Sequence, residues 1–544
     1  MISNKYVDIY IDLYESGKIK LNKERVMLID YLQEHVLIRD DLYFHEEQIN
    51  NFKRFTEKWY FPLEPFQMFI AAFAFLFYKE NRRNFFRKFL IMMGRGGGKN
   101  GLITALTNFF ISELHGIPKY NVSIVANSED QAKTSFMEMY ETIEEHEVLE
   151  EMFYKTKVEI KNNATKSIVK YRTSNASTKD GLRDGCVIYD EIHQYETNEV
   201  VRVFSSGLGK VKNPREFFIG TDGYVREGYL DKMKERANNI LEGKELSDSL
   251  FPFICKLDEA EEVEDISTWE KANPMFCEPR SDYAEGLFYI VQEEFKDLVN
   301  DPSNREEFMT KRMNLPEVDL AKSVASWEDI LATNRPFPDL SHRTCVGGLD
   351  FASIKDFAAV GLLFKVGEDY VWKSHSFVRK GFLDTVTLKV PIKEWERQGH
   401  LTIVDEPVID IRHIVNWFVE MRELYGLTKI VADTFRLDLV RTALEAEGFE
   451  LEFIRNPKAI HSLLAPRVET LFAKSCIIFD DNPLMRWYTN NVYVHIKKDG
   501  NKEYLKKDEF RRKTDGFQAF IHSLFKADEI LVDDVDFFLD DIEF

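Results

Sequence analysis

A lysine that follows a run of glycines is the first feature of this sequence whose residue types and spacing suggest chemistry. The run lies between an apolar segment, Phe89–Met93, and a helix predicted to begin near Asn100. Glycines let backbone N–H groups turn toward an anion, the start of a helix adds partial positive charge, and Lys99 adds a full charge. We therefore predict a nucleotide phosphate site formed by Arg95, Gly96, Gly97, Gly98, Lys99 and Asn100.

The loop departs in two places from the usual pattern, G-x-x-x-x-G-K-[ST]. Met93 stands where the first glycine belongs, and Asn100 replaces the hydroxyl residue that normally holds Mg²⁺. An ordinary glycine-rich turn is the alternative interpretation. The strand expected before the loop and the helix expected after it favour the phosphate site.

A pair of carboxylates follows a second apolar segment. Val187–Tyr189 is predicted to form a central buried strand, and Asp190 and Glu191 come directly after it. Ligands of open α/β sheets bind at the carboxyl ends of the strands. Asp190 is therefore predicted to hold Mg²⁺, and Glu191 to orient or activate the attacking water. The acidic pair is weak evidence alone and much stronger together with the Lys99 loop.

Two polar residues are further candidates for nucleotide contacts. Gln67 lies at the start of a helix expected to open at Pro65, and its amide has both a donor and an acceptor for an adenine edge. A simple helix cap is an equally good interpretation of Gln67. Thr221 follows a strand expected at Glu216–Ile219 and either senses the γ-phosphate or belongs to a plain turn.

Two arginines are candidates for stabilising the charge that develops in phosphoryl transfer. Arg95 lies inside the glycine loop, and Arg183 lies shortly before the acidic strand. A guanidinium near the transferred phosphate lowers the barrier to hydrolysis. The sequence leaves open which arginine acts within its own subunit and which acts across a subunit interface.

Three carboxylates in the second half suggest a separate chemistry. Asp350 ends a strand expected at Cys345–Leu349, Asp433 ends a second strand, and Asp515 heads a helix with an apolar face, with Asp356 as a possible helper. This arrangement matches the ribonuclease-H-like plan, in which two divalent ions ~3.5–4 Å apart clamp a phosphodiester. Mg²⁺ keeps several waters, so three acids suffice. In a chain with 93 acidic residues each acid alone is more often on a solvated face.

A basic segment lies between the second and third acids. Residues 497–513 contain eight lysines or arginines, with a hairpin turn expected at Asp499-Gly500. We favour a contact with the DNA backbone over a solvated hairpin that balances local acids. The final stretch, 528–544, carries eight acids and no bases, and is predicted to be a mobile tail or a partner-binding segment.

Length and composition set the organisation of the chain. The 544 residues allow several domains, with predicted limits at 1–55 (helical cap), 56–244 (nucleotide-binding core), 245–338 (helical lid or linker), 339–527 (the acidic-triad domain) and 528–544 (tail). The net charge of −21 argues against a coat of nucleic acid but permits a local basic channel. Five scattered cysteines suggest a reducing compartment, no signal peptide is evident, and the longest apolar run is too short to span a bilayer.

Nine motifs along the chain resemble those of the large terminase subunit of tailed double-stranded DNA phages. They are FQ at 66–67, RGGGKN at 95–100, DGLRDGCVIYDE at 180–191, FFIGTDG at 217–223, WEKANP at 269–274, GLDFASIKDFAA at 348–359, VADTF at 431–435, NPLMRWYTNNV at 482–492 and TDGFQAF at 514–520. Their order and spacing cover nearly the whole length. The loop with Arg95 and Asn100 looks typical of that family.

The resemblance implies an α/β protein with an N-terminal P-loop (RecA/ASCE-like) ATPase domain and a C-terminal ribonuclease-H-like nuclease domain. It implies a motor that uses ATP with Mg²⁺ to thread double-stranded DNA through the portal protein into a prohead, and a nuclease that cuts concatemers with two ions, Mg²⁺ or Mn²⁺. A small terminase subunit, a homo-oligomeric ring that is commonly a pentamer, and work in the host cytoplasm outside the mature virion are also implied. The implied sites are Lys99, Asp190 and Glu191 in the ATPase, and Asp350, Asp433 and Asp515 in the nuclease.

Two other classes of protein remain as alternatives. A superfamily-2 helicase is suggested because residues 190–193 match a D-E-x-H box and Gln67 could serve as a Q motif. Such a helicase needs a second ATPase-like lobe, where this chain has the acidic triad. A non-catalytic DNA scaffold descended from an ATPase is the other alternative.

Overall fold

The chain divides into two units, residues 1–317 and 318–544. The computed structural model describes residues 2–173, 183–195, 197–223, 228–245, 249–301, 304–316, 322–386, 388, 390–434, 437–497, 500–507 and 512–530. The predicted turn residue Asp499 and most of the predicted acidic tail lie outside these ranges. No helix in these ranges is long and apolar enough to cross a membrane.

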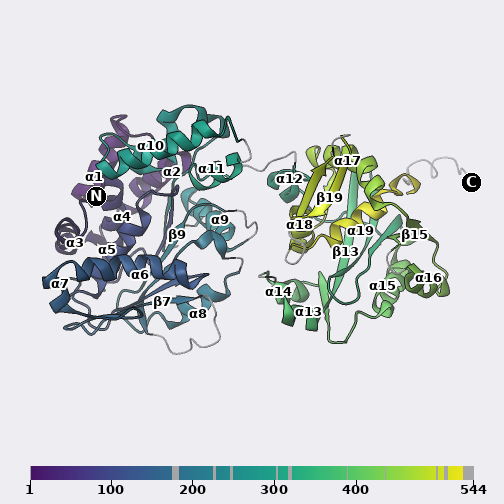
Figure 1. Cartoon of the computed structure of the whole chain (residues 1–544), viewed down its shortest axis with the longest axis horizontal. Helices are drawn as coiled ribbons and strands as arrows, with labels where there is room; N and C mark the ends of the chain where they lie inside the picture. Colours follow the sequence, from purple (N-terminus) through teal and green to yellow (C-terminus); the bar gives the residue numbers. More distant parts are fainter. Residues whose placement is uncertain are drawn as a thin grey trace, which may run out of the picture. The chain divides into compact units, whose positions relative to one another are not determined.

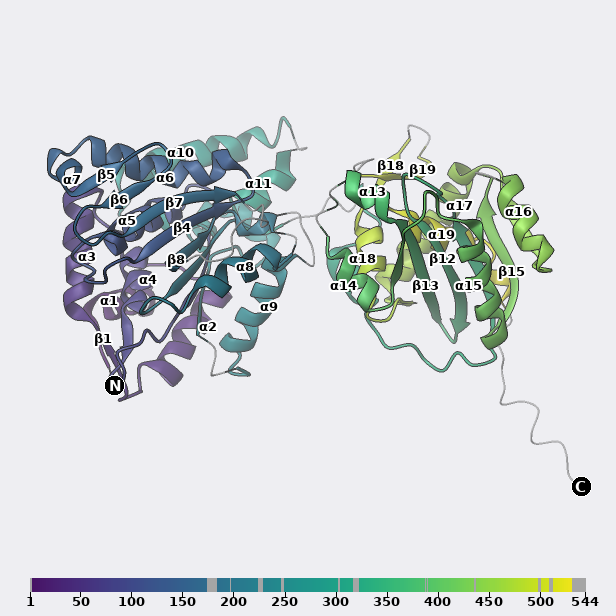
Figure 2. The same ribbon diagram turned by 90° about the horizontal axis from the view of Figure 1, so that it is seen from below.

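The first unit is built on an eight-stranded sheet (Figures 1 and 2). Its order is β10 (Leu250–Ile254), β3 (Lys88–Met92), β9 (Arg215–Gly220), β8 (Asp184–Tyr189), β4 (Asn121–Ala126), β7 (Ile168–Thr173), β6 (Ile160–Asn162) and β5 (Phe153–Lys155). The first six strands are parallel and the last two are antiparallel. Strands β3, β8, β9 and β10 are buried along almost their whole length, as strands of a doubly covered parallel sheet are.

Helices cover both faces of this sheet (Figure 2). Helices α5 (Lys99–Ile111) and α6 (Glu129–Glu144) lie on one face, and α8 (Glu199–Gly207) and α9 (Tyr229–Leu241) lie on the other. The expected succession of strand, glycine loop and helix is confirmed, with β3 beginning one residue earlier than predicted. Because the parallel strands share one carboxyl edge, the residues after β3, β8 and β9 meet there.

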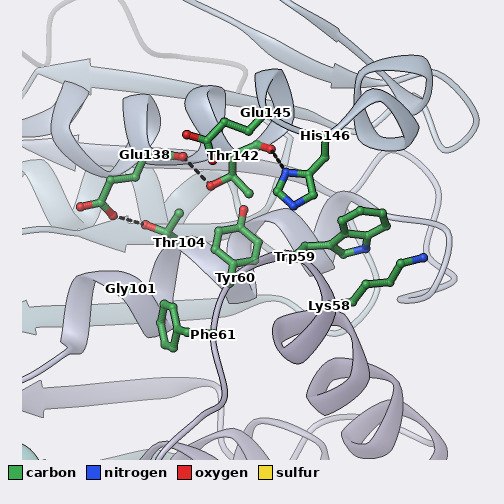
Figure 3. Close-up of a pocket in the computed structure, with 10 residues that line it drawn as sticks. All are labelled: Lys58, Trp59, Tyr60, Phe61, Gly101, Thr104, Glu138, Thr142, Glu145 and His146. Carbon is green, nitrogen blue, oxygen red and sulfur yellow. Dashed lines mark hydrogen bonds between the residues drawn. The ribbon is translucent and has the colours of Figure 1, made fainter. Parts of the chain in front are cut away.

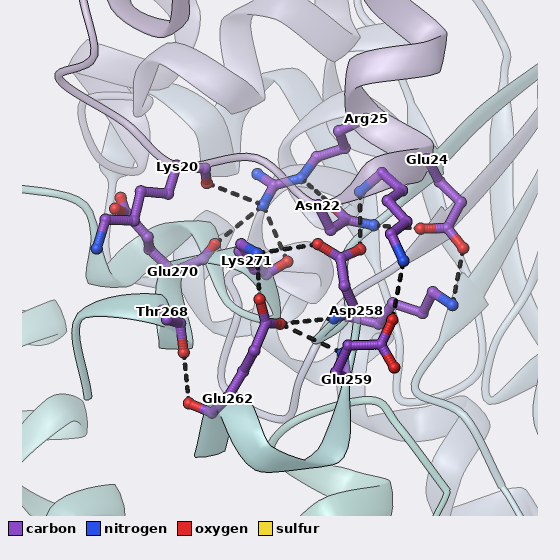
Figure 4. A network of polar contacts seen from close by, with 12 residues as sticks. Lys20, Asn22, Glu24, Arg25, Asp258, Glu259, Glu262, Thr268, Glu270 and Lys271 are labelled. Carbon is purple, nitrogen blue, oxygen red and sulfur yellow. Dashed lines mark hydrogen bonds and ion pairs between the residues drawn. The ribbon is translucent and has the colours of Figure 1, made fainter. Parts of the chain in front are cut away.

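The N-terminal helices are tied to a segment far along the chain (Figure 4). They are α1 (Lys5–Glu15), α2 (Lys23–Tyr31), α3 (Glu46–Trp59) and α4 (Pro65–Ala74), with short strands β1 (Leu42–Phe44) and β2 (Leu76–Tyr78). The buried Arg25 donates to the carbonyl oxygens of Glu270 and Lys271, 3.0 and 2.9 Å away. Lys271 pairs in turn with Asp258 at 2.9 Å. The predicted cap and the predicted lid therefore contact each other within the first unit.

The region predicted to be a helical lid or linker begins instead with a strand. Leu250–Ile254 forms β10, which pairs in parallel with β3. The sequence prediction missed it because prolines interrupt the region. Pro252 is tolerated here because β10 is an edge strand, where a missing N–H breaks no ladder bond. Helices α10 (Asp282–Asp297) and α11 (Arg305–Lys311) follow, and the two units divide at 317/318, whereas the predicted boundary is at 338/339.

The second unit is a mixed sheet in the order β14 (Leu401–Val404), β13 (Asp369–Arg379), β12 (Ala358–Val366), β11 (Thr344–Asp350), β15 (Gly426–Asp433) and β16 (Leu451–Ile454), with β17 (Ile477–Ile478) beside β13. Strands β11, β12 and β13 are antiparallel, and β15 runs parallel to β11. The strand predicted before Asp350 is confirmed as β11, and it forms an antiparallel pair with β12.

One helix of the second unit packs unusually close to the sheet. Helix α19 (Asp515–Leu524) lies over β11 beside α17 (Pro457–Ala473) and α18 (Pro483–Asn490), while α15 (Ile411–Leu424) and α16 (Leu437–Ala446) cover the other face (Figure 1). A Cβ at Gly348 would lie 2.1 Å from the carbonyl oxygen of Ala519. Only glycine leaves room for α19 at this distance. The hairpin β18 (Val492–Ile496) and β19 (Lys502–Lys506) and the helices α7 (Glu147–Met152), α12 (Trp327–Leu331), α13 (Lys380–Thr385) and α14 (Ile392–Arg397) complete the named elements.

Candidate functional site

The glycine loop of the first unit has the geometry of an anion cradle. Gly98 caps α5 with φ +76°, and Gly96 has φ +87°. Lys99 is buried at the first position of α5. Burial lowers its pKa, although the nearby Glu191 and Asp190 oppose the shift. The amino end of α5 and a desolvated lysine together form a site that gains free energy by binding phosphate.

Gln67 braces the loop from the side of α4. Its Nε2 donates to the carbonyl oxygen of Gly98 at 3.1 Å, and its Oε1 accepts the backbone N–H of Glu64 at 3.0 Å. The second bond belongs to a capping box at the start of α4. Both ends of the amide are therefore engaged within the protein, which favours the capping interpretation of Gln67.

The segment around α11 holds the loop from another side. The backbone N–H of Arg95 donates to the carbonyl oxygen of Lys311 at 2.7 Å. The Arg312 guanidinium donates to the carbonyl oxygen of Arg95 at 3.1 Å. A Cβ at Gly94 would lie 2.2 Å from the carbonyl oxygen of Arg312, so only glycine fits at that position. The phosphate loop is thus fixed by a segment more than two hundred residues away in the sequence.

The carboxylate pair lies at the same edge of the sheet, after β8. Asp190 is 3% exposed, and burial together with the charge of Glu191 raises its pKa to about 7. The Glu191 backbone N–H donates to Asp190 Oδ1 at 2.9 Å, and Glu191 adopts φ +50°, a left-handed conformation that is strained for a non-glycine residue. A cation bound next to Asp190 would relieve the cost of burying this charge.

Asn100 supplies a second oxygen next to the phosphate loop. Its Oδ1 is buried and accepts no hydrogen bond from any residue that the structure describes. A buried oxygen without a partner costs free energy, and a ligand that binds to it removes that cost. The chemistry of Asp190 and Asn100, both hard oxygen donors, fits Mg²⁺.

The two arginines lie in different places relative to the loop. The exposed Arg95 side chain is 3.4 Å from Glu307 on α11. Arg183 is exposed and precedes β8, so it lies at the opposite end of the strand from Asp190. At about 3.3 Å per residue the separation is roughly 20 Å. The structure does not bring Arg183 together with Lys99 within one chain.

Thr221 is buried directly after β9 and contacts Lys311, a residue that the sequence did not single out for this site. Its Oγ1 accepts a hydrogen bond from Lys311 Nζ at 3.2 Å. Lys311 Nζ also lies 2.9 Å from His193 Nε2. His193 was visible in the sequence only as part of a D-E-x-H box, and no local pattern marks Lys311, which comes from α11.

An aromatic pocket of about 350 Å³ opens beside the first turns of α5 (Figure 3). It is lined by Lys58, Trp59, Tyr60, Phe61, Gly101, Thr104, Glu138, Thr142, Glu145 and His146. Thr104 Oγ1 donates to Glu138 at 3.1 Å, and burial raises the pKa of Glu138. The pocket adjoins Gly101, two residues after Lys99, and its rings offer faces on which a planar base can stack.

The predicted carboxylates of the second unit also converge. Asp350 ends β11 and Asp433 ends β15, the adjacent parallel strand. Asp515 opens α19, a helix that packs on both strands. Asp515 itself is 3% exposed. The charges of Asp515 and Asp433 add to burial in raising the pKa of Asp350 well above its usual range. The three acids thus gather at one end of the sheet.

Two lysines counter this negative charge. Lys506 on β19 lies 2.5 Å from Asp356, and Lys513 lies 3.2 Å from the same carboxylate. Burial and the charge of Asp356 raise the pKa of Asp515 to about 8. Asp356 therefore lies beside the triad, as the helper interpretation expected.

The donor set of this acidic site suits a hard divalent ion. Asp515 Oδ2 is buried without a hydrogen bond among the described residues. The three acids lie at the same end of the sheet, but in the described part of the chain no group of three acidic, histidine or cysteine side chains is yet close enough to hold a metal ion. Carboxylates that repel one another, one of them with an uncompensated oxygen, fit Mg²⁺ or Mn²⁺, which would draw them together.

The basic segment beside the triad is largely paired with acids. Lys497 lies 2.5 Å from Glu503, and Lys502 pairs with Glu469. The first residues of the predicted tail also lie against this unit, where Arg467 pairs with Asp528 at 2.8 Å. These four lysines, Lys497, Lys502, Lys506 and Lys513, thus pair with local acids, and a DNA contact stays a prediction.

Comparison with known proteins gives one family for both units. A model of the terminase large subunit, endonuclease domain, matches residues 244–530, more than half of the chain, and one of the terminase large subunit, ATPase domain, matches residues 65–239. The terminase large subunit of Lactococcus phage p2 is 24% identical over 467 residues and covers 83% of each chain. The large subunit of the terminase of Enterobacteria phage HK97 is 22% identical over 461 residues, 80% of this chain and 85% of that one. The crystal structure of the HK97 bacteriophage large terminase aligns with a TM-score of 0.49 and 18% identity over 89% of this chain and 99% of that chain.

Proposed function

This chain belongs to the family of terminase large subunits, and from that premise we propose which of its residues perform the two activities. The protein is an ATPase and a DNA endonuclease, a DNA-packaging motor subunit that translocates double-stranded DNA into the prohead and cuts concatemers. The assignment of residues rests on how the structure places them. Lys99 lies near Asp190 and Glu191 at one sheet edge, and three acids lie together in the second unit.

In the ATPase site, Lys99 and the amides of residues 95–100 bind the phosphates, and Asp190 and Asn100 hold Mg²⁺. Bound Mg²⁺ neutralises charge on the β- and γ-phosphates. Glu191 orients the attacking water and takes its proton, and Thr221 reports the state of the γ-phosphate. The base of ATP enters the aromatic pocket beside Gly101, because the phosphates would lie at the first turn of the same helix.

Arg183 acts across a subunit interface in this proposal. It is exposed and lies at the far end of β8 from the phosphate site of its own chain. Arg95 remains at the loop, where release from Glu307 would let its guanidinium reach the phosphates. A guanidinium supplied by a neighbour makes hydrolysis depend on assembly into a ring.

In the nuclease site, Asp350, Asp433 and Asp515 hold two divalent ions. Divalent ions held there would supply positive charge for activating a water and for stabilising the leaving 3′ oxygen. Asp356 with Lys506 and Lys513 sets the charge beside the triad, and the lysines that pair with carboxylates exchange those partners for DNA phosphates. The donor chemistry of these carboxylates supports the metal assignment.

The remaining partners follow from the family. We propose a homo-oligomeric ring, of five subunits, on the portal protein, a small terminase subunit that selects the DNA, and activity in the host cytoplasm with no place in the mature virion. As functional segments the predicted limits, 1–55, 56–244, 245–338, 339–527 and 528–544, remain part of this proposal, while the two structural units divide at 317/318. A superfamily-2 helicase is not favoured, because the second unit matches an endonuclease model where a helicase requires a second ATPase lobe.

The experiment that tests these assignments is plasmid cleavage with Mg²⁺ or Mn²⁺, measured beside ATP hydrolysis on the same preparations. Wild-type protein is compared with Asp433→Ala and Glu191→Gln. We expect Asp433→Ala to lose cleavage and keep hydrolysis, and Glu191→Gln to do the reverse. Cleavage that survives in Asp433→Ala removes this acid from the site.

A further inference from the structure

A lysine from the α11 segment reaches into the ATPase site from outside the motifs that the sequence displays. Lys311 Nζ lies 2.9 Å from His193 Nε2, 3.2 Å from Thr221 Oγ1 and 2.8 Å from the carbonyl oxygen of Asp222. Lys311 is 9% exposed. A buried ammonium surrounded by three acceptors at hydrogen-bond distance is an ordered group, because its three N–H donors match the three acceptors.

The lysine decides where the proton of His193 resides. An ammonium group donates hydrogen bonds and has no lone pair with which to accept one. His193 Nε2 must therefore accept, so in the neutral imidazole the hydrogen lies on Nδ1. Burial, with a further contribution from Lys311, lowers the pKa of His193 to about 3, so the ring stays neutral.

The protonated nitrogen faces the proposed catalytic carboxylate. His193 Nδ1 lies 3.1 Å from Glu191 Oε2. The nitrogen is buried and the angle falls short of a hydrogen bond, so Nδ1 has no completed partner among the described residues. At this distance only the relative orientation of the two groups has to change for the bond to form. His193 thus offers an N–H donor to the group that has to hold the attacking water.

Two glycines hold the imidazole in this orientation. A Cβ at Gly223 would lie 2.6 Å from His193 Cδ2, and one at Gly220 would lie 3.3 Å from His193 Nδ1. The ring therefore fits in a narrow slot against the segment that follows β9. Because the slot prevents a ring flip, the tautomer set by Lys311 fixes the direction of the donor.

From these contacts we propose that Lys311 is a positioning residue of the ATPase site, which fixes His193 as the Nδ1–H tautomer and so orients the Glu191 carboxylate. The inference rests on the proposed role of Glu191. The backbone of the same lysine binds the phosphate loop, since its carbonyl oxygen accepts the Arg95 N–H at 2.7 Å. A displacement of α11 would therefore disturb the loop and the carboxylate together.

The kinetic test compares Lys311→Met with Lys311→Arg and with Lys234→Met in the full chain. Lys234 is the matched control, because it lies 2.9 Å from Asp222 Oδ2 and does not contact His193 in the described structure. We expect Lys311→Met to lower kcat for ATP hydrolysis ~10- to 100-fold, as loss of an outer-shell orienting group does. The KM for ATP should change less than ~3-fold. Lys311→Arg should recover part of the loss, and Lys234→Met should match wild type.

A double variant separates this role from general loss of stability. If Lys311 acts through His193, then His193→Phe should lower kcat to a similar level, and Lys311→Met with His193→Phe should be no worse than the more severe single variant. Additive losses would overturn the proposed chain of contacts. Equal kcat values for Lys311→Met and Lys234→Met would overturn it as well.

A spectroscopic measurement tests the tautomer directly. In protein with ¹⁵N-labelled histidine rings, His193 should show the ¹⁵N shift of a protonated nitrogen at Nδ1 and of an unprotonated nitrogen at Nε2. Lys311→Met should convert it toward a tautomer mixture. A protonated Nε2 in the wild type would contradict the inference.

The outcome with Glu191→Gln distinguishes this inference from the proposed function beneath it. If Glu191→Gln keeps full hydrolysis, the assignment of Glu191 fails, and the inference about Lys311 fails with it. If Glu191→Gln loses hydrolysis while Lys311→Met keeps it, only the role of Lys311 is rejected.

Discussion

Gln67 Nε2 donates a hydrogen bond to the carbonyl oxygen of Gly98, 3.1 Å away, and so joins the first turn of α4 to the last residue of the phosphate loop. The other end of the same amide caps α4. A Cβ at Gly98 would lie 3.0 Å from this Nε2, so the loop and the amide are closely fitted. The contact makes Gln67 a structural support of the nucleotide site.

Gln67→Glu should separate these two tasks. A glutamate at the third helical position still caps α4, since its oxygen accepts the N–H of Glu64, but it has no donor for Gly98. We expect the KM for ATP to rise by about 5- to 30-fold, because a lost buried hydrogen bond costs about 1–2 kcal/mol. Phosphate-release assays measure the change. Gln67→Ala should also lower the melting temperature, because it loses the helix cap as well. A wild-type KM in Gln67→Glu would show that the hydrogen bond to Gly98 does not support the nucleotide site.

Lys99→Ala should abolish ATP turnover and leave metal-dependent DNA cleavage largely intact. The lysine ammonium is the buried positive charge at the start of α5, and its loss should cost ~10²-fold or more in kcat. Turnover and plasmid nicking are measured on one preparation. Loss of cleavage in a folded Lys99→Ala protein would contradict two independent sites.

Asp350→Asn should produce the opposite phenotype. The substitution keeps the size of the side chain and removes a metal-binding charge worth several kcal/mol, so cleavage should fall ~10²-fold or more. ATP turnover should stay at the wild-type level. Asp410→Asn, at a partly exposed helix cap of the same unit, is the control and should cleave normally.

Arg183→Ala should be complemented by a subunit that is defective elsewhere. If the guanidinium acts on a neighbour's nucleotide, then Arg183→Ala and Lys99→Ala proteins are each inactive alone. A mixture at concentrations that favour assembly should recover part of the ATPase activity, because a wild-type Arg183 then faces an intact Lys99 site. A mixture as inactive as its components would remove Arg183 from the interface.

The first unit should lose stability below neutral pH. His115 is buried, donates from Nδ1 to the carbonyl oxygen of Phe110 at 2.9 Å, and has a pKa lowered to about 3 by burial. The unfolded chain binds a proton near pH 6.5 and the folded chain does not, so stability is present above that pH and falls as pH drops. The loss is about 1.4 kcal/mol per pH unit for one histidine.

Denaturant unfolding at pH 7.0 and pH 5.5 measures this dependence. In His115→Phe, the free energy of unfolding should change less with pH, by the contribution of about one bound proton. This holds even if the variant is less stable at both pH values. His35→Gln, near the surface of the same unit, is the control. An unchanged slope in His115→Phe would show that this histidine titrates equally in both states.

Short stretches of sequence were enough to predict where the candidate site residues lie in the fold. The phosphate loop, the Asp190–Glu191 pair and the acids at Asp350, Asp433 and Asp515 each sit where a strand ends or a helix begins. Residue type and local hydrophobic pattern are enough to indicate such positions, because adjacent residues determine strand ends and helix starts.

Only the tertiary structure decided how these groups are supported. Gln67 supports Gly98, Lys311 reaches His193, and Gly348 admits α19 through contacts between segments far apart in the chain. The strand β10 was concealed by Pro252, and the far position of Arg183 follows from the direction of β8. A single sequence contains no periodic signal for such pairs. They are fixed by the packing of whole elements, in which each buried donor and acceptor must find a partner wherever the fold provides one.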